Sequence, residues 1–184
     1  MNKIFGFLLI SLLLTSCFST RQLVIKDYST EIIDLPFEFT QIEFVDKRDT
    51  VLPMIWDVPL TGIKHKEWIG NPILSDSIKT DIIRIIQQSG KKDGIPVAVE
   101  FRVIEGVCKL NANWKSVTEY AKFKGELYID IPSRRMSSLC YAEIFYENST
   151  LNGTEKHTVM LYNYAIRNVT HFLLIKAKEA IKLD

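Results

Sequence analysis

The chain has no excess of charge of either sign. Its 184 residues carry 23 basic and 22 acidic side chains, which gives a formal net charge of +1 at pH 7. Proteins that bind nucleic acid depend on clustered positive charge that pairs with phosphates. The composition therefore gives no support for nucleic acid, or for a strongly acidic molecule, as the partner.

The sequence also lacks the motifs of the common catalytic and metal sites. It has three histidines, His65, His157 and His171, and no two of them have the spacing of a zinc-binding helix. It contains neither the Gly-x-Ser-x-Gly turn of α/β-hydrolases nor a phosphate-binding P-loop. We therefore predict a protein that is not an enzyme and that has no metal, cofactor or catalytic residues.

A single long apolar run is present, at residues 4–14, and it is too short to span a bilayer, which needs roughly 20 apolar residues. The run follows Lys3 and precedes Thr15 and Ser16. A positive charge, a short apolar segment and small residues are typical of a secretory signal peptide. We expect residues 1–16 to be this signal, so that the rest of the chain works outside the cytoplasm.

The residues Leu14-Thr15-Ser16-Cys17 resemble the lipobox of bacterial lipoproteins. The resemblance implies that Cys17 becomes the first residue and carries a thioether-linked diacylglycerol and an amine acylated with a fatty acid such as palmitate. Two or more acyl chains anchor a protein stably to a membrane. An ordinary signal peptide with an incidental cysteine and an uncleaved anchor remain as alternatives.

The residues after Cys17 indicate in which membrane the lipid would be anchored. Phe18 is not the Asp that disfavours outer-membrane sorting in enteric bacteria, and residues 18–22 lack the acidic cluster that resembles a surface-export signal. We therefore expect a protein of the cell envelope, anchored in the outer membrane and facing the periplasm.

Behind the anchor we expect a tether at residues 17–29 and a single α+β domain at residues 30–184. Alternating apolar and polar residues predict strands at 41–46, 96–110, 120–131 and 139–147. Apolar residues at helical spacing predict a helix that starts at Asn71-Pro72 and ends at Ser89-Gly90, and a long helix capped by Asn152. The order β-α-β-β-β-α predicts an antiparallel meander with the helices on one face.

Two cysteines fall on the first and third strands of that meander. Cys108 and Cys140 would then be separated by about 9.6 Å, twice the interstrand spacing. Disulfides need Cα atoms within about 7 Å, so we expect two buried thiols. An oxidising compartment keeps a disulfide as the alternative. Glu105-Gly106 interrupts the first strand of the meander and predicts a bulge.

A second resemblance involves Asp46-Lys47-Arg48 at the end of the first strand and Ile69-Gly70 before the first helix. With the lipobox and the element order, this pattern resembles that of small YajG-like outer-membrane lipoproteins. The resemblance implies an accessory or binding role and no chemistry. Asp46 and Arg48 are then either a structural ion pair or contacts to a partner.

Residues 51–68 form a long Trp- and Pro-containing stretch between these two motifs. Loops longer than about 12–15 residues are usually functional or disordered, and this one is too apolar for disorder. Met54, Ile55, Trp56 and Trp68 suit an anchor at an interface. The alternative is a flap or short hairpin packed on its own domain.

Taken together, these features predict a lipid-anchored, extracytoplasmic binding or assembly accessory protein without catalytic activity. Its expected partners are the membrane, through the lipid on Cys17, and a protein of the envelope. The alternative is an extracytoplasmic hydrolase whose active site is assembled from distant residues.

Overall fold

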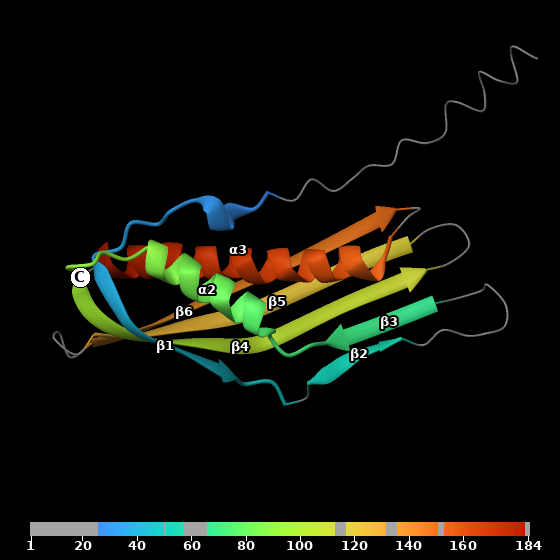
Figure 1. Ribbon diagram of the computed structural model, residues 1–184, viewed down its shortest axis with the longest axis horizontal. Helices are drawn as coiled ribbons and strands as arrows, with labels where there is room; N and C mark the ends of the chain where they lie inside the picture. The colour runs from blue at the N-terminus through green and yellow to red at the C-terminus, as the bar shows by residue number, and fades with distance from the viewer. Residues whose placement is uncertain are drawn as a thin grey trace, which may run out of the picture.

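The structure is a computed structural model that describes residues 26–49, 51–56, 66–112, 117–131, 136–150 and 153–182. Cys17 and the expected signal peptide lie outside these residues. In chain order the elements are η1 (Tyr28–Thr30), β1 (Phe37–Asp46), β2 (Leu52–Trp56), β3 (Lys66–Asn71), α2 (Asp76–Gln88), β4 (Ile95–Ala112), β5 (Val117–Ile131), β6 (Met136–Thr150) and α3 (Glu155–Lys182) (Figure 1). The predicted α+β fold and its order β-α-β-β-β-α are confirmed, with a β2–β3 hairpin added between β1 and α2.

Six strands of the described chain form one mixed sheet in the order β2-β3-β4-β5-β6, with β1 parallel to β4. Two strands share one edge of β4: β1 pairs with its first half, up to Val103, and β3 with its second half, from Cys108. A bulge lies between these halves, just before the predicted Glu105-Gly106, because the register shifts between Val103 and Glu105. The strands β4, β5 and β6 form the predicted antiparallel meander.

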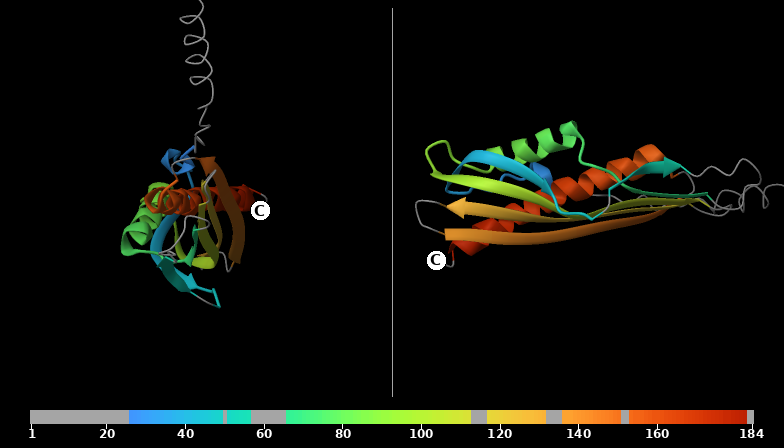
Figure 2. Two further views of the ribbon diagram at one scale, coloured as in Figure 1. Left: turned by 90° about the vertical axis from the view of Figure 1, so that its right-hand side faces the viewer. Right: turned by 90° about the horizontal axis from the view of Figure 1, so that it is seen from below.

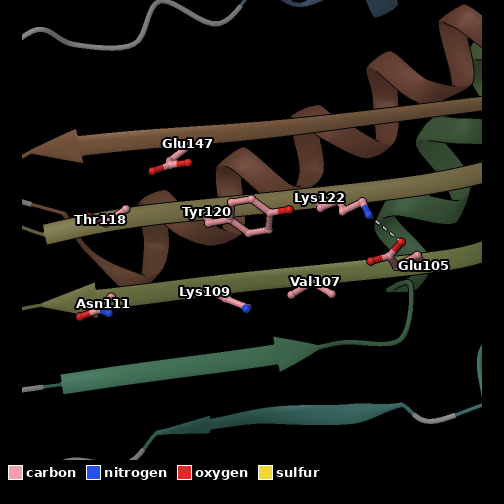
Figure 3. Close-up of a pocket in the computed structure, with 8 residues that line it drawn as sticks. All are labelled: Glu105, Val107, Lys109, Asn111, Thr118, Tyr120, Lys122 and Glu147. Carbon is pink, nitrogen blue, oxygen red and sulfur yellow. Dashed lines mark ion pairs between the residues drawn. The ribbon is translucent and has the colours of Figure 1, made fainter.

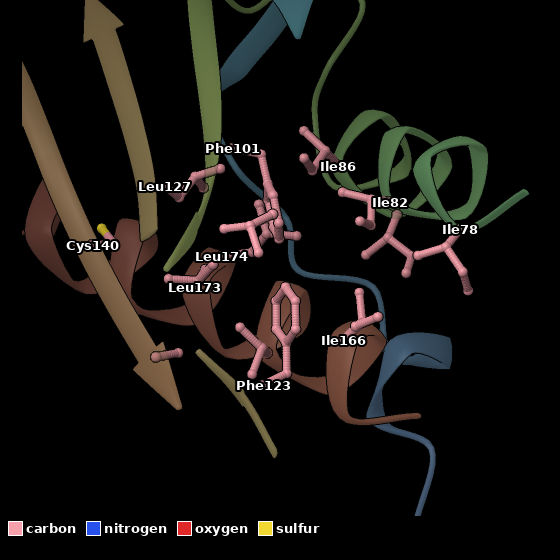
Figure 4. Close-up of a cluster of buried hydrophobic side chains, with 14 of the residues drawn as sticks. Ile78, Ile82, Ile86, Phe101, Phe123, Leu127, Cys140, Ile166, Leu173 and Leu174 are labelled. Carbon is pink, nitrogen blue, oxygen red and sulfur yellow. The ribbon is translucent and has the colours of Figure 1, made fainter. Parts of the chain in front are cut away.

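Both helices lie on the same face of the sheet (Figure 2). Side chains along β5 alternate between fully buried and half-buried, because successive residues of a strand point to opposite faces. The inward side chains pack with those of α2 and α3 in one apolar core (Figure 4). The large side chains buried most completely in it include Phe37, Phe101, Phe123, Ile82, Ile86, Leu127, Leu161, Ile166 and Leu173.

The first long helix begins later than predicted. α2 starts at Asp76 rather than at Asn71-Pro72, because the Ser75 hydroxyl accepts a hydrogen bond from the Ile78 N–H at 3.3 Å and caps the helix. The helix ends at the predicted Ser89-Gly90, but its C-terminal cap is Ser89 and not the expected glycine.

The two buried cysteines lie on β4 and β6 and are not joined by a disulfide. Cys108 is opposite Ala121 of β5, and Cys140 is opposite Leu127 of the same strand. The two thiols are therefore separated both across β5 and along it, which confirms the expectation of two buried thiols.

Candidate functional site

The face of the sheet opposite the helices carries the outward side chains of β3 to β6, and we call it the outer face. No helix of the described chain covers it (Figure 2). Leu139, Tyr141 and Phe145 of β6 are 57%, 39% and 62% exposed there, and we call these three side chains the β6 row. Because β6 is the last strand of the sheet, the row runs along an edge. Exposed apolar side chains that lie together often mark an interaction site.

An open hollow of about 460 Å³ lies on the outer face, over β4, β5 and the adjoining part of β6 (Figure 3). Its volume falls within the range of small-molecule sites, about 300–1,000 Å³. The side chains that line it are Glu105, Val107, Lys109, Asn111, Thr118, Tyr120, Lys122 and Glu147.

The charge of Lys122 in this hollow is already matched by two carboxylates. Its Nζ lies 2.8 Å from Glu105 Oε2 and 3.2 Å from Glu143 Oε1. The hydrogen bond with Glu105 is the main cause that raises the pKa of Lys122 to about 12. Hydrogen bonds from Tyr141 and Lys122 lower the pKa of Glu143. Lys122 and Glu143 are therefore both charged at neutral pH.

Two stacked rings form a flat apolar surface beside the hollow, which we call the aromatic platform. The centroids of Tyr120 and Phe145 are 6.4 Å apart and their planes differ by 26°. Lys109 and Glu147 are the residues opposite Tyr120 on β4 and β6. The Lys109 Nζ lies 6.0 Å from the centroid of the Tyr120 ring. One row across three strands thus carries a cation, an aromatic ring and an anion.

A second cluster of polar groups surrounds a buried carboxylate at the start of α3. Glu119 of β5 is fully buried and accepts hydrogen bonds from the Thr154 N–H at 3.0 Å and from Asn148 Nδ2 at 3.1 Å. Its Oε2 also lies 2.5 Å from Nδ1 of His157. A carboxylate at this position interacts favourably with the positive end of the helix dipole. The cluster therefore ties the start of α3 to β5 and β6.

This cluster also explains why α3 starts later than predicted. The Thr154 hydroxyl accepts a hydrogen bond from the His157 N–H at 3.2 Å and so caps a helix that begins at Glu155. The expected cap, Asn152, lies outside the described residues.

A carboxylate that holds an imidazole also occurs in hydrolases, where it orients the general base. Such a site needs a hydroxyl or thiol next to the imidazole. The Thr158 hydroxyl is directed to Glu119 and to the Thr154 carbonyl instead. Among the described residues, no hydroxyl or thiol is hydrogen-bonded to the His157 ring.

The structure brings together the two short motifs that the sequence keeps apart. The Arg48 guanidinium binds Asp46, with Nε 2.8 Å from Oδ1, and donates to the Asn71 side chain and, at 3.0 Å, to the Pro72 carbonyl. The hydrogen bond that the Arg48 side chain donates to Asp46 lowers the pKa of that carboxyl group. The side chain of Arg48 is 3% exposed, which favours the structural ion pair over a contact to a partner.

The hairpin residues expected at an interface are described only as backbone. Trp56 pairs with Trp68 in the register of β2 and β3, and Ile55 pairs with Ile69. The side chains of Met54, Ile55, Trp56 and Trp68, and all of residues 57–65, lie outside the described part of the chain. Ile69 is 40% exposed and opposite Lys109, so β3 continues the outer face beside the hollow.

Sequence reasoning missed the hollow, the platform and the Glu119 cluster. The alternation on β5 indicated a solvent-exposed face, but only the register of β4, β5 and β6 shows which exposed residues are neighbours. Glu119 had a detectable signal, because it is a charged residue in phase with the apolar Ala121 and Phe123.

No protein-family model, curated protein or solved structure matches the chain. No helix in the described ranges is long and apolar enough to cross a membrane. The described residues contain no group of three or more His, Cys, Asp or Glu side chains placed to hold a metal ion. The resemblances to bacterial lipoproteins and to the YajG-like family remain sequence-based predictions.

Proposed function

We propose that this chain is a lipid-anchored, extracytoplasmic binding or assembly accessory protein, without catalytic activity, that binds an envelope protein through its outer face. The lipobox-like leader supports the anchor and the compartment. The expected site of action is the periplasmic face of the outer membrane.

The observation that carries the binding role is the β6 row. Three large apolar or aromatic side chains, Leu139, Tyr141 and Phe145, are exposed along one edge strand. Exposing them to water is unfavourable, since burial of apolar area contributes about 25 cal/mol per Å². A partner that covers the row gains this free energy. Aromatic residues are also enriched where proteins bind one another.

The alternative function, an extracytoplasmic hydrolase, is favoured by one observation, the Glu119–His157 pair. In that case His157→Ala would abolish activity towards an ester or peptide substrate, whereas substitutions of outer-face residues would leave that activity unchanged. An unchanged rate in His157→Ala would leave the alternative without support.

Photo-crosslinking in cells tests the proposed function. A photoreactive amino acid at Leu139 should give a discrete adduct with an envelope protein. The matched control is Met160 of α3, an apolar side chain of comparable exposure, 41% against 57%, on a helix rather than on the outer face. Adducts that form equally from both positions, or only from Met160, would contradict a partner surface on the sheet.

A further inference from the structure

The hollow on the outer face has a composition that suits one class of ligand, and this inference rests on the proposed binding role of that face. Its charged side chains are two lysines and two glutamates, so the formal charges cancel. Lys122 is engaged by Glu105 and Glu143. Lys109 is separated from Glu147 only by the ring of Tyr120 in the cross-strand row.

This balance argues against an anionic ligand. A phosphate or polyanion is bound by cations that are free to pair with it. In the hollow one lysine already has two carboxylate partners, and the other has a carboxylate in the same row. With Glu143 counted, a polyanion would therefore meet three carboxylates and only two lysines, one of which is already engaged. A neutral polar ligand meets no such repulsion.

The aromatic platform supplies the second element of recognition. Phe145 is 62% exposed, and it stacks on Tyr120, which lines the hollow. The faces of a sugar ring carry C–H groups, which pack on an aromatic ring, while the hydroxyls at its rim donate and accept hydrogen bonds. Lys109 donates, Glu147 accepts and Thr118 does both, so all three types of polar contact border the platform.

We propose that the hollow binds a neutral oligosaccharide, with one sugar ring on the Tyr120–Phe145 platform and its hydroxyls directed to Lys109, Glu147 and Thr118. An open hollow on a sheet suits a chain of several sugars, because the ends of the chain extend past it without a steric stop.

The test is a titration of the full lipidated chain in a zwitterionic detergent that has no sugar headgroup. The neutral probes are chitotetraose and cellotetraose, and tetragalacturonate is an anionic probe of similar length. Isothermal titration calorimetry should show saturable binding of a neutral probe and weaker or no binding of the anionic one.

Variants locate the site. Tyr120→Ala should weaken binding about fivefold to tenfold, as loss of one aromatic contact does, and Tyr120→Phe should stay within about twofold of the wild type. The matched control is Tyr128→Ala, because Tyr128 lies on the same strand and face but beside Arg102, outside the hollow. If Tyr120→Ala fails to fold, Glu147→Gln replaces it, with an expected loss of about threefold.

Three results would overturn the inference: no saturable binding of either neutral probe, tighter binding of the anionic probe, or equal losses in Tyr120→Ala and Tyr128→Ala. If no sugar binds but Leu139 still crosslinks to an envelope protein, the sugar site is rejected and the proposed function stands. If neither occurs, both are rejected.

Discussion

At the scale of single residues, Arg48 connects the end of β1 to the segment between β3 and α2. Its planar guanidinium has five N–H donors, and in this position they meet a carboxylate, an amide side chain and a backbone carbonyl. A lysine at the same place offers a single ammonium on a flexible stem and cannot reproduce this geometry.

Arg48→Ala should therefore lower the free energy of unfolding by about 2–3 kcal/mol, the size expected when a charged group loses several buried hydrogen bonds. The control is Arg84→Ala, since Arg84 is 53% exposed and its contact to Asp81 is 3.5 Å long, so that the loss should stay within about 0.5 kcal/mol. Urea denaturation measures both. Equal losses in the two variants would mean that the junction at Arg48 adds no special stability.

His171 makes stability depend on pH. It is 1% exposed, and burial lowers its pKa below the ordinary value of 6.5, with Glu31 at 3.9 Å opposing the shift in part. The unfolded chain thus takes up a proton at a higher pH than the folded one. The unfolding free energy should fall as the pH drops below about 6.5 and be unaffected by this group above that value.

In His171→Gln the difference in unfolding free energy between pH 7.5 and 5.5 should shrink. Carboxylates with a lowered pKa, such as Asp46, lose their contribution only at more acidic pH and do not interfere in this window. A variant with the same pH dependence as the wild type would show that another group titrates.

At the scale of elements, the sequence was sufficient for the meander and for the stripe of α3, because both rest on long periodic patterns. Seven residues of that helix are predicted to share one face: Tyr162, Ile166, Val169, Leu173 and Ala177 are buried, and Val159 and Ala180 are half-buried. The predicted starts of α2 and α3 were wrong, since several residues before each helix are chemically able to cap it. Only the fold shows that Arg48 holds Asn71 at the end of β3, which leaves Ser75 to cap α2.

The hairpin was harder to predict than the meander. Residues 52–56 and 66–71 have no regular alternation, and they form strands because β4 is long enough to offer a free edge beside the end of β1. The composition of a segment does not show whether a neighbouring strand has spare length. For the same reason, a single sequence does not show which residues of β4, β5 and β6 become neighbours and form the hollow.

A further prediction concerns Trp56, in the β2–β3 hairpin. If Trp56 anchors a partner, as the sequence predicts, Trp56→Ala should cost about 2–4 kcal/mol in binding while the melting temperature holds. Met160→Ala on α3 is the control for a nonspecific effect. If the ring is buried in its own domain instead, the change should cost about 3–5 kcal/mol of stability. A large fall in melting temperature with unchanged capture would remove the hairpin from the interface.

At the scale of the whole molecule, the proposed lipid anchor would decide where the outer face works. Wild-type protein should take up a labelled fatty acid, and Cys17→Ala should yield unprocessed precursor, or protein without lipid, because the Cys17 thiol is the proposed attachment point. Cys140→Ala is a control that keeps the lipid. Wild-type protein without label would end the lipoprotein proposal.

The shared edge of β4 also has a consequence for the order of folding. β4, β5 and β6 follow one another in the chain and can zip together locally, whereas Phe37 of β1 must find Ile95 across the hairpin and α2. Closing that long loop is entropically costly, and such distant pairings slow folding. In a chain exported with its amino terminus first, β1 would thus emerge before β4 and pair with it only later. We expect the alternating apolar residues of β1 to be the segment that most needs a holding chaperone during transit.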